Sequence, residues 1–133
     1  MRTMTKTRLT VFVWLIGFAA GTTTHAIDLV LGGRDVYSDF PTLVRCFWVL
    51  LTVLDPLIVV LLIRRSRAAA PMAVIVMVAD LAVNWSVFFA VGGLSLFGVL
   101  AQSLFGAFVF LTAAHVWRSH RRCSRRQTSA SRN

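Results

Sequence analysis

Four long apolar runs constrain the fold of this chain more than any other feature of its sequence. They cover about residues 9–31, 43–63, 72–91 and 96–117. Each reaches the length of roughly 20 residues that a helix needs to cross the hydrocarbon core of a bilayer. The runs are continuously apolar, without the alternation that is typical of the strands of an outer-membrane barrel. The sequence therefore predicts an all-α membrane protein, a bundle of four transmembrane helices.

Composition excludes the other broad classes of protein. Hydrophobic residues make up 57% of the 133 residues and charged residues only 14%, whereas about a quarter of a soluble domain is charged. A body this small has too little interior to bury so much apolar surface in water. The apolar content is also too high for intrinsic disorder over most of the chain. An integral membrane protein is the class that remains.

The cationic residues predict the orientation of the bundle. Twelve of them fall in the segment before the first run, in the second connection or in the C-terminal tail: Arg2, Lys6, Arg8, Arg64, Arg65, Arg67, Arg118, Arg121, Arg122, Arg125, Arg126 and Arg132. The other side has only Arg34 and Arg45. Because cytoplasmic loops are enriched in Lys and Arg, both termini are predicted to be cytoplasmic. The predicted location is the plasma (inner) membrane of a bacterium, as a multi-pass protein.

The first run has a second interpretation. Residues 1–8 and the apolar stretch after them also resemble a secretory signal, with Thr24-His25-Ala26 as its cleavage site. Apolar residues resume after Asp28 and extend the run to full spanning length, which favours a retained helix. Cleavage stays open as the alternative, and it would leave three spans and remove His25.

Ionisable residues inside membrane spans are costly and usually face protein or a water-filled cavity. A first group lies near the outer ends of the spans. Asp28 and Arg45 are at similar depth there, and they are predicted to form an ion pair if their helices are neighbours. His25 and Gln102 lie one turn deeper. The alternative is that Asp28 and Arg45 extend separately to the outer headgroups.

A second group lies deeper. Asp55 and Asp80 are each about eight residues from the inner ends of their spans, so both sit roughly 12 Å above the cytoplasmic surface of the core. No Lys or Arg lies at that level, so burial should keep at least one of the two carboxyl groups neutral. Thr52 and Asn84 are one turn away and are predicted to hydrogen-bond to them. Pro56 is predicted to kink the second helix.

These polar residues predict a site inside the membrane that binds protons or a small lipophilic or cationic ligand. The candidate binding residues are Asp55, Asp80, Asn84, Thr52, His25, Asp28, Arg45 and Gln102. The alternative is a non-catalytic accessory or structural membrane protein, in which protonated aspartates fasten two helices through helix–helix contacts. The chain has no phosphate-binding loop, nucleophile elbow or metal-ligand spacing, so no catalytic residue, cofactor or metal is expected.

The expected partners follow from the same features. The lipid bilayer surrounds the four spans, and the basic tail of residues 118–133 lacks apolar periodicity. The tail is predicted to be disordered, cytoplasmic and in contact with anionic lipid headgroups rather than with nucleic acid. Gly17 and Gly21 form a G-x-x-x-G pair, which serves close helix packing. That packing is either inside the bundle or between copies in a homo-oligomer.

Two stretches carry a resemblance. Phe-Trp at residues 47–48 precedes Leu-Thr-Val-Leu-Asp-Pro-Leu at 51–57, and Val-Ala-Asp at 78–80 precedes Asn84. This layout resembles small bacterial four-span membrane proteins for which no function is established. The resemblance extends over the first three spans, and it implies the four-helix fold without an activity.

A second, fainter similarity rests on His-Ala-Ile-Asp at residues 25–28 and on the Asp55-Pro56 pair. These features are similar to the emopamil-binding and sigma-2 group of four-helix membrane proteins. In that group, acidic residues of the helices line a pocket for sterols or lipophilic amines. The similarity implies a ligand pocket, but the chain contains no Glu and so departs from the acid pattern of the group. Sterol isomerase activity is therefore not carried over.

Overall fold

The described part of the chain is built from four long helices. The computed structural model describes residues 2–130, and the side chains of residues 6–121. The helices are α1 (Arg2–Gly32), α2 (Thr42–Ile63), α3 (Ala69–Ala90) and α4 (Leu96–Ala130), with a short 3-10 turn, η1 (Gly33–Asp35), after α1. Each long helix contains a stretch that is long and apolar enough to cross a membrane. The predicted set of four helices is confirmed.

The helix bounds differ from the predicted ones mainly at the two ends of the chain. Helix α1 begins at Arg2 rather than at residue 9, and α4 continues from residue 117 to Ala130. The apolar runs show only which part of each helix is apolar. A helix can continue beyond its apolar run, because Arg, Lys, Gln and Ser are compatible with a helical backbone. The predicted tail therefore begins within α4, and residues 131–133 lie outside the described part of the chain.

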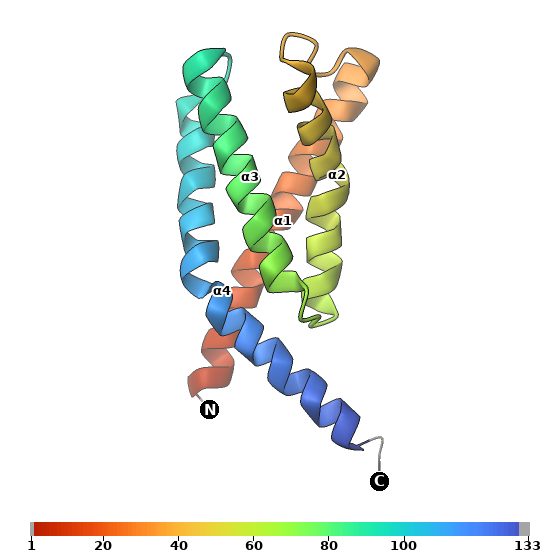
Figure 1. Ribbon diagram of the computed structural model, residues 1–133, viewed down its shortest axis with the longest axis vertical. Helices are drawn as coiled ribbons and strands as arrows, with labels where there is room; N and C mark the ends of the chain where they lie inside the picture. The colour runs from red at the N-terminus through yellow and green to blue at the C-terminus, as the bar shows by residue number, and fades with distance from the viewer. Residues whose placement is uncertain (1, 131–133) are drawn as a thin grey trace.

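The helices form two antiparallel pairs. Helix α1 packs mainly against α2, and α3 packs mainly against α4. The start of α1, the connection at residues 64–68 and the last turns of α4 lie at one end of the bundle (Figure 1), which we call the basic end. The connections at residues 33–41 and 91–95 lie at the other end, which we call the distal end. The first turn of α1 and the last turn of α4 are thus at the same end of the molecule.

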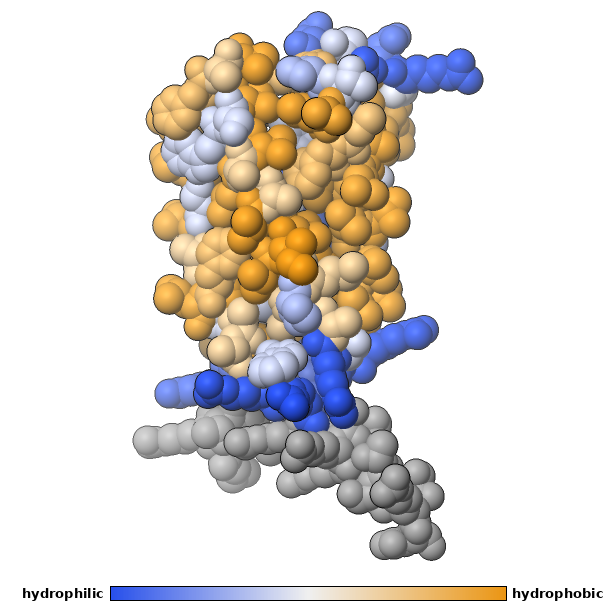
Figure 2. Space-filling model, in the orientation of Figure 1, coloured by the Kyte–Doolittle hydropathy of each residue, from blue (hydrophilic) through white to orange (hydrophobic). Residues whose placement is uncertain are grey.

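The surface between the two ends is apolar. On the face that Figure 2 shows, the middle of the bundle is an almost continuous hydrophobic band, with hydrophilic residues at the ends. Several large apolar side chains are more than four-fifths exposed: Val30, Leu31, Leu43, Phe97 and Leu111. Water-soluble proteins rarely expose contiguous apolar surface beyond a few hundred Å². Each helix thus has apolar residues on the side that faces the core of the bundle and on the side that faces outward.

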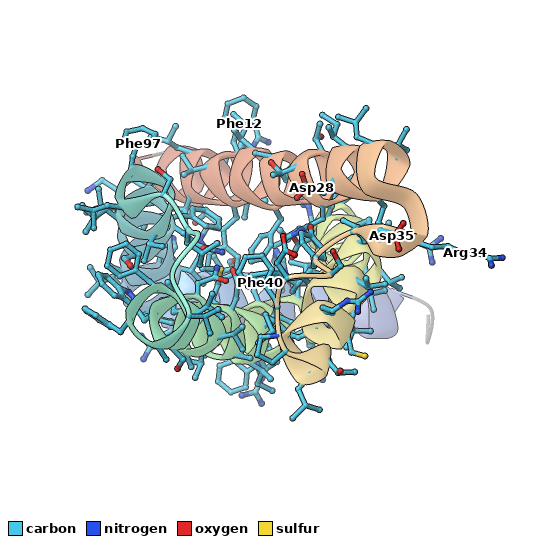
Figure 3. All side chains as sticks on the ribbon, turned by 90° about the horizontal axis from the view of Figure 1, so that it is seen from above. Phe12, Asp28, Arg34, Asp35, Phe40 and Phe97 are labelled. Carbon is cyan, nitrogen blue, oxygen red and sulfur yellow. The ribbon has the colours of Figure 1, made fainter. Side chains whose placement is uncertain are left out.

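Helix α1 crosses the bundle obliquely. Viewed along the bundle, it extends across one side, opposite α3, with α4 and α2 at its two ends (Figure 3). Its first half contacts α4, where Trp14 Nε1 donates to Thr112 Oγ1 at 3.0 Å and Phe18 packs edge-on against Phe105. Its second half lies beside α2. Because α1 leaves α4 as it approaches the distal end, a space opens between these two helices.

The G-x-x-x-G pair of α1 faces the interior. The ring of Phe105 lies directly against Gly17, and the carboxylate of Asp55 lies against Gly21. A Cβ atom at Gly21 would be 2.5 Å from Asp55 Oδ2. Of the two interpretations of this pair, packing inside the bundle is therefore the one that the structure supports. The glycines let α1 approach the side chains of α2 and α4 closely.

Replacing Gly17 with alanine should destabilise the protein. The added methyl group would meet the Phe105 ring, which is held edge-on by Phe18, so we expect the free energy of unfolding to fall by about 1 kcal/mol. Gly98→Ala on α4 is the matched control, because its nearest neighbour, Ser95 Cβ, is 4.0 Å from the new Cβ. Unfolding in mixed detergent micelles measures both, and equal effects would contradict the close approach at Gly17.

Candidate functional site

The oblique path of α1 leaves a cavity of about 650 Å³ between the helices, in the distal half of the bundle. All four helices contribute to its walls, together with the connection that follows α1. Most of its lining is apolar or aromatic, including Phe18, Phe40, Trp48, Met77 and Phe105. Its polar lining residues include His25, Asp28, Asp55, Asp80, Asn84 and Gln102. Neither Lys nor Arg lines it.

Asp55 projects from the middle of α2 into this cavity. Its side chain is only 6% exposed, and across the cavity wall it meets the backbone of Gly21. No hydrogen bond or ion pair links Asp55 to any other residue in the described part of the chain. Pro56 follows it inside the helix and has no N–H, so the carbonyl of Thr52 loses its usual helical donor nearby. Asp55 is thus a largely buried carboxyl group that opens onto the cavity and has no partner among the residues with described side chains.

Asp80 has the opposite surroundings. It projects from α3, is 5% exposed, and accepts a hydrogen bond from Asn84 Nδ2 at 3.2 Å through Oδ1. Its other oxygen accepts from the Gln102 side-chain amide on α4. Asn84 is held in turn by Trp48 Nε1, which donates to Asn84 Oδ1 at 2.9 Å. Side chains from α2, α3 and α4 therefore surround Asp80, and the predicted Asp80–Asn84 hydrogen bond is confirmed.

The two aspartates line one cavity, as their equal depth in the sequence predicted. Their chemistry differs, because both oxygens of Asp80 accept from amide groups, whereas no residue with a described side chain donates to Asp55. Among the residues with described side chains, no three His, Cys, Asp or Glu side chains come close enough together to hold a metal ion. The site can therefore offer one satisfied carboxyl group and one carboxyl group that is free to receive a proton or a cation.

A second polar group closes the distal end of the cavity. Tyr37, in the connection after α1, donates its hydroxyl to Asp28 Oδ2 at 2.7 Å, and His25 Nδ1 lies 3.4 Å from the same hydroxyl. Burial raises the pKa of Tyr37, and the hydrogen bond to Asp28 raises it further. Tyr37 has a φ of 61°, an unfavourable backbone conformation for a residue with a side chain. Its ring packs edge-on against the ring of Trp48, with 4.9 Å between the two ring centroids.

Two predicted site residues do not belong to the site. Arg45 does not pair with Asp28 but directs its guanidinium to the backbone carbonyl of Arg34, at 3.5 Å. The predicted ion pair is not formed, and Asp28 Oδ2 instead accepts a hydrogen bond from the hydroxyl of Tyr37. Thr52 donates to the Val49 carbonyl at 2.6 Å rather than to Asp55, a bond that a helical threonine makes readily within its own turn. Neither Arg45 nor Thr52 lines the cavity.

Three aromatic residues of the site were missed by the sequence analysis. Trp48 is only 4% exposed, and Tyr37 and Phe40 pack edge-on against its ring. Figure 3 shows Phe40 near the middle of the bundle, where a Cβ at Gly93 would lie 3.4 Å from its ring. A signal for Trp48 exists, because it lies seven residues before Asp55 and therefore on the same helical face. The connection that carries Tyr37 and Phe40 has no such periodicity.

Comparisons of the chain with protein-family models, with curated proteins and with solved structures find no match. No family is therefore assigned, and the two resemblances drawn from the sequence stay expectations. What the protein does has to be argued from its own residues. The most informative of these is the buried carboxyl group of Asp55, which faces a cavity and has no partner in the described part of the chain.

Proposed function

We propose that the chain is a multi-pass protein of the bacterial plasma (inner) membrane with both termini in the cytoplasm. The exposed apolar band supports insertion into a bilayer. The basic end supports the orientation, because seven of the nine cationic residues with described side chains belong to its elements: Lys6, Arg8, Arg64, Arg65, Arg67, Arg118 and Arg121. The positive-inside rule makes that end cytoplasmic. The cavity then lies in the outer half of the membrane, and the basic tail lies on the cytoplasmic surface.

We further propose that the protein binds a small lipophilic amine in the cavity, through Asp55. The single observation that carries this proposal is a carboxyl group, 6% exposed, that faces a cavity without any donor or cation from the described residues. An unpaired buried carboxyl group costs free energy in the ligand-free protein. A cationic ligand removes that cost by forming an ion pair with Asp55, so the site gains most from a ligand that brings its own positive charge.

The walls of the cavity favour a ligand with an apolar body. Its volume of about 650 Å³ lies within the usual range for small-molecule sites. The rings of Phe18, Phe40, Trp48 and Phe105 offer apolar contact, and an ammonium group gains additional attraction from aromatic faces. An anionic ligand would be repelled by the two aspartates. A proton alone would need neither the volume nor the aromatic walls.

Binding of phenylbutylamine to the full-length protein in detergent tests this proposal. We expect Asp55→Asn to weaken the binding at least about tenfold, because the amide cannot form the ion pair. Phenylbutanol has the same apolar body without the charge and should bind the wild-type protein much more weakly. Isothermal titration calorimetry measures both ligands. Asp39→Asn is the matched control, because it removes an exposed acid that does not line the cavity.

Three results would count against amine binding. The first is unchanged affinity in Asp55→Asn, and the second is equal affinity of the wild-type protein for phenylbutylamine and phenylbutanol. The third is the absence of any binding by the wild-type protein, which would favour the alternative of a structural or accessory membrane protein. Thermal unfolding of each variant in the same detergent establishes that it is folded before its affinity is compared.

A further inference from the structure

The cavity that contains Asp55 is closed on one side of the bundle and open on another. The described residues of α2 and α3 that line it are all buried, at most 9% exposed: Trp48, Asp55, Met77, Asp80 and Asn84. On α1 and α4, several lining residues are also exposed at the surface: Ala20, Thr24, Gly98 and Ala101. A residue that both lines a cavity and is exposed lies where the cavity meets the outside. The cavity therefore opens between α1 and α4, and we call these four residues the rim.

The path of α1 sets the limits of this opening. Toward the basic end it is closed, because the ring of Phe105 lies directly against Gly17. From there α1 and α4 diverge toward the distal end (Figure 1). The distal end of the cavity is covered by Tyr37 and Phe40, which are half-buried and pack edge-on against Trp48. The opening therefore points to the side of the bundle, between two helices that each contain a membrane-length apolar stretch.

The rim is small and apolar. Ala20, Gly98 and Ala101 have at most a methyl side chain, and the Thr24 hydroxyl donates to the Ala20 carbonyl of its own helix at 3.0 Å. Beside the rim, Phe97 is 82% exposed and projects outward on the α1 side of the bundle in Figure 3. Ala101 lies about 8 Å along α4 from its first residue, so part of the rim is at the depth of the acyl chains in a bilayer that surrounds the bundle.

We propose that the ligand enters this cavity sideways, from the hydrocarbon of the bilayer, through the opening between α1 and α4. This inference rests on the proposed function, and it names the class of ligand more closely. The ligand is an amphiphile that first dissolves in the membrane leaflet at the distal end. Its concentration in the membrane, rather than in water, then determines how fast the site fills. The small rim residues serve this entry because they leave the gap between the two helices free of side chains.

Labelling of a thiol inside the cavity tests the route without any amine. Val99→Cys, in a chain with Cys46→Ser and Cys123→Ser, places the thiol on a lining residue that is only 3% exposed. The full-length protein in lipid nanodiscs is treated with N-phenylmaleimide, which dissolves in the membrane, or with a sulfonated maleimide, which stays in water. Mass spectrometry follows the labelled fraction over time. Each rate is divided by the rate of the same probe with the protein denatured in sodium dodecyl sulfate.

We expect N-phenylmaleimide to label Val99→Cys at least about tenfold faster than the sulfonated probe on this relative scale, because a charged probe enters hydrocarbon at a high cost. Adding Ala20→Phe should slow N-phenylmaleimide at least about tenfold, because the ring has to move before the probe can pass. Ala19→Phe is the matched control: Ala19 is exposed on the same helix and does not line the cavity. Its labelling rate should stay within about twofold of that of Val99→Cys alone.

A second pair of variants tests the other side of the rim. Ala101→Phe should slow the labelling as Ala20→Phe does, whereas Ala107→Phe, exposed on α4 and outside the cavity lining, should not. Thermal unfolding shows whether each variant is folded, and the Ala101 pair carries the test if Ala20→Phe fails to fold. Met77→Cys, 3% exposed on the α3 wall, replaces Val99→Cys if that variant is unstable.

Slower labelling in the rim variants alone, together with preference for the membrane-soluble probe, supports the sideways entrance. Equal rates for the two probes would overturn it and indicate an opening to water. Equal rates in rim and control variants would indicate another route, and a thiol that reacts only after denaturation would indicate a closed cavity; both overturn the proposal. If the expected pattern is found but phenylbutylamine does not bind, the entrance stands and the proposed ligand is wrong. If the amine binds without this pattern, the entrance alone is wrong.

Discussion

Asp55→Leu should make the ligand-free protein more stable than the wild type, raising the free energy of unfolding by about 2 kcal/mol. The reason is that the side chain of Asp55 is buried and receives no hydrogen bond from the described residues. A leucine has the same branching and removes the polar group from its apolar surroundings without leaving a partner unsatisfied. Most substitutions of buried residues are destabilising. A gain in stability at this position would mark Asp55 as a residue kept for binding.

Unfolding in mixed detergent micelles measures this effect, with and without phenylbutylamine. A ligand that binds only the folded state stabilises it, so the amine should stabilise the wild type and leave Asp55→Leu unchanged. The exposed Asp39→Leu is the control for the loss of one negative charge. A clear loss of stability in ligand-free Asp55→Leu would contradict the prediction and would make Asp55 a structural residue.

Asp80→Leu should have the opposite effect and lower the free energy of unfolding by about 3 kcal/mol. Asp80 is as buried as Asp55, and both substitutions replace an aspartate by a leucine. What differs is that Asn84 and Gln102 both donate to Asp80. Removing their acceptor leaves buried amide groups with fewer partners, and such unsatisfied donors are expensive in a medium of low dielectric constant. The contacts that join α3 to α4 at this level are lost as well.

The same unfolding experiment tests Asp80, with Asp80→Asn as the conservative variant. The asparagine keeps the size and one acceptor oxygen, so we expect a smaller loss than with leucine. Interhelical hydrogen bonds in membranes are often worth less than 1 kcal/mol each. If Asp80→Leu is as stable as the wild type, the amide contacts to Asp80 contribute nothing. If both aspartates respond with the same sign, the distinction between a satisfied and an unsatisfied carboxyl group is wrong.

Much of the site could be predicted because it depends on position along single helices. Asp55 and Asp80 were placed at one level by counting residues, and both line the same cavity. The hydrogen bond between Asp80 and Asn84 follows from their spacing of four residues, which brings side chains together on any helix. The same counting failed for Thr52, because a threonine three residues away can bond to its own helical backbone instead.

The rest of the site depends on which helices are neighbours and at what angle. Tyr37 reaches Asp28 from a short connection, and this contact replaces the ion pair that was expected with Arg45. Gln102 was expected at the depth of His25, and both residues line the cavity, but the sequence did not indicate that the Gln102 amide bonds to Asp80 on α3. Trp48 is buried inside the bundle, where Tyr37 and Phe40 pack against it from a connection without periodicity. None of these pairings has a spacing that could be read along one helix.

The sequence by itself determined that the chain forms four apolar helices, because backbone hydrogen bonds in an apolar medium have to be satisfied within each segment. It also determined where along the chain the basic residues cluster and at what level along their helices the acidic residues lie. Only the tertiary structure decided which acid has partners. The oblique path of α1 opens the cavity beside Asp55, and Gln102 and Asn84 close around Asp80. Hydrogen bonding between helices depends on their crossing and rotation, and no local pattern of residues encodes either.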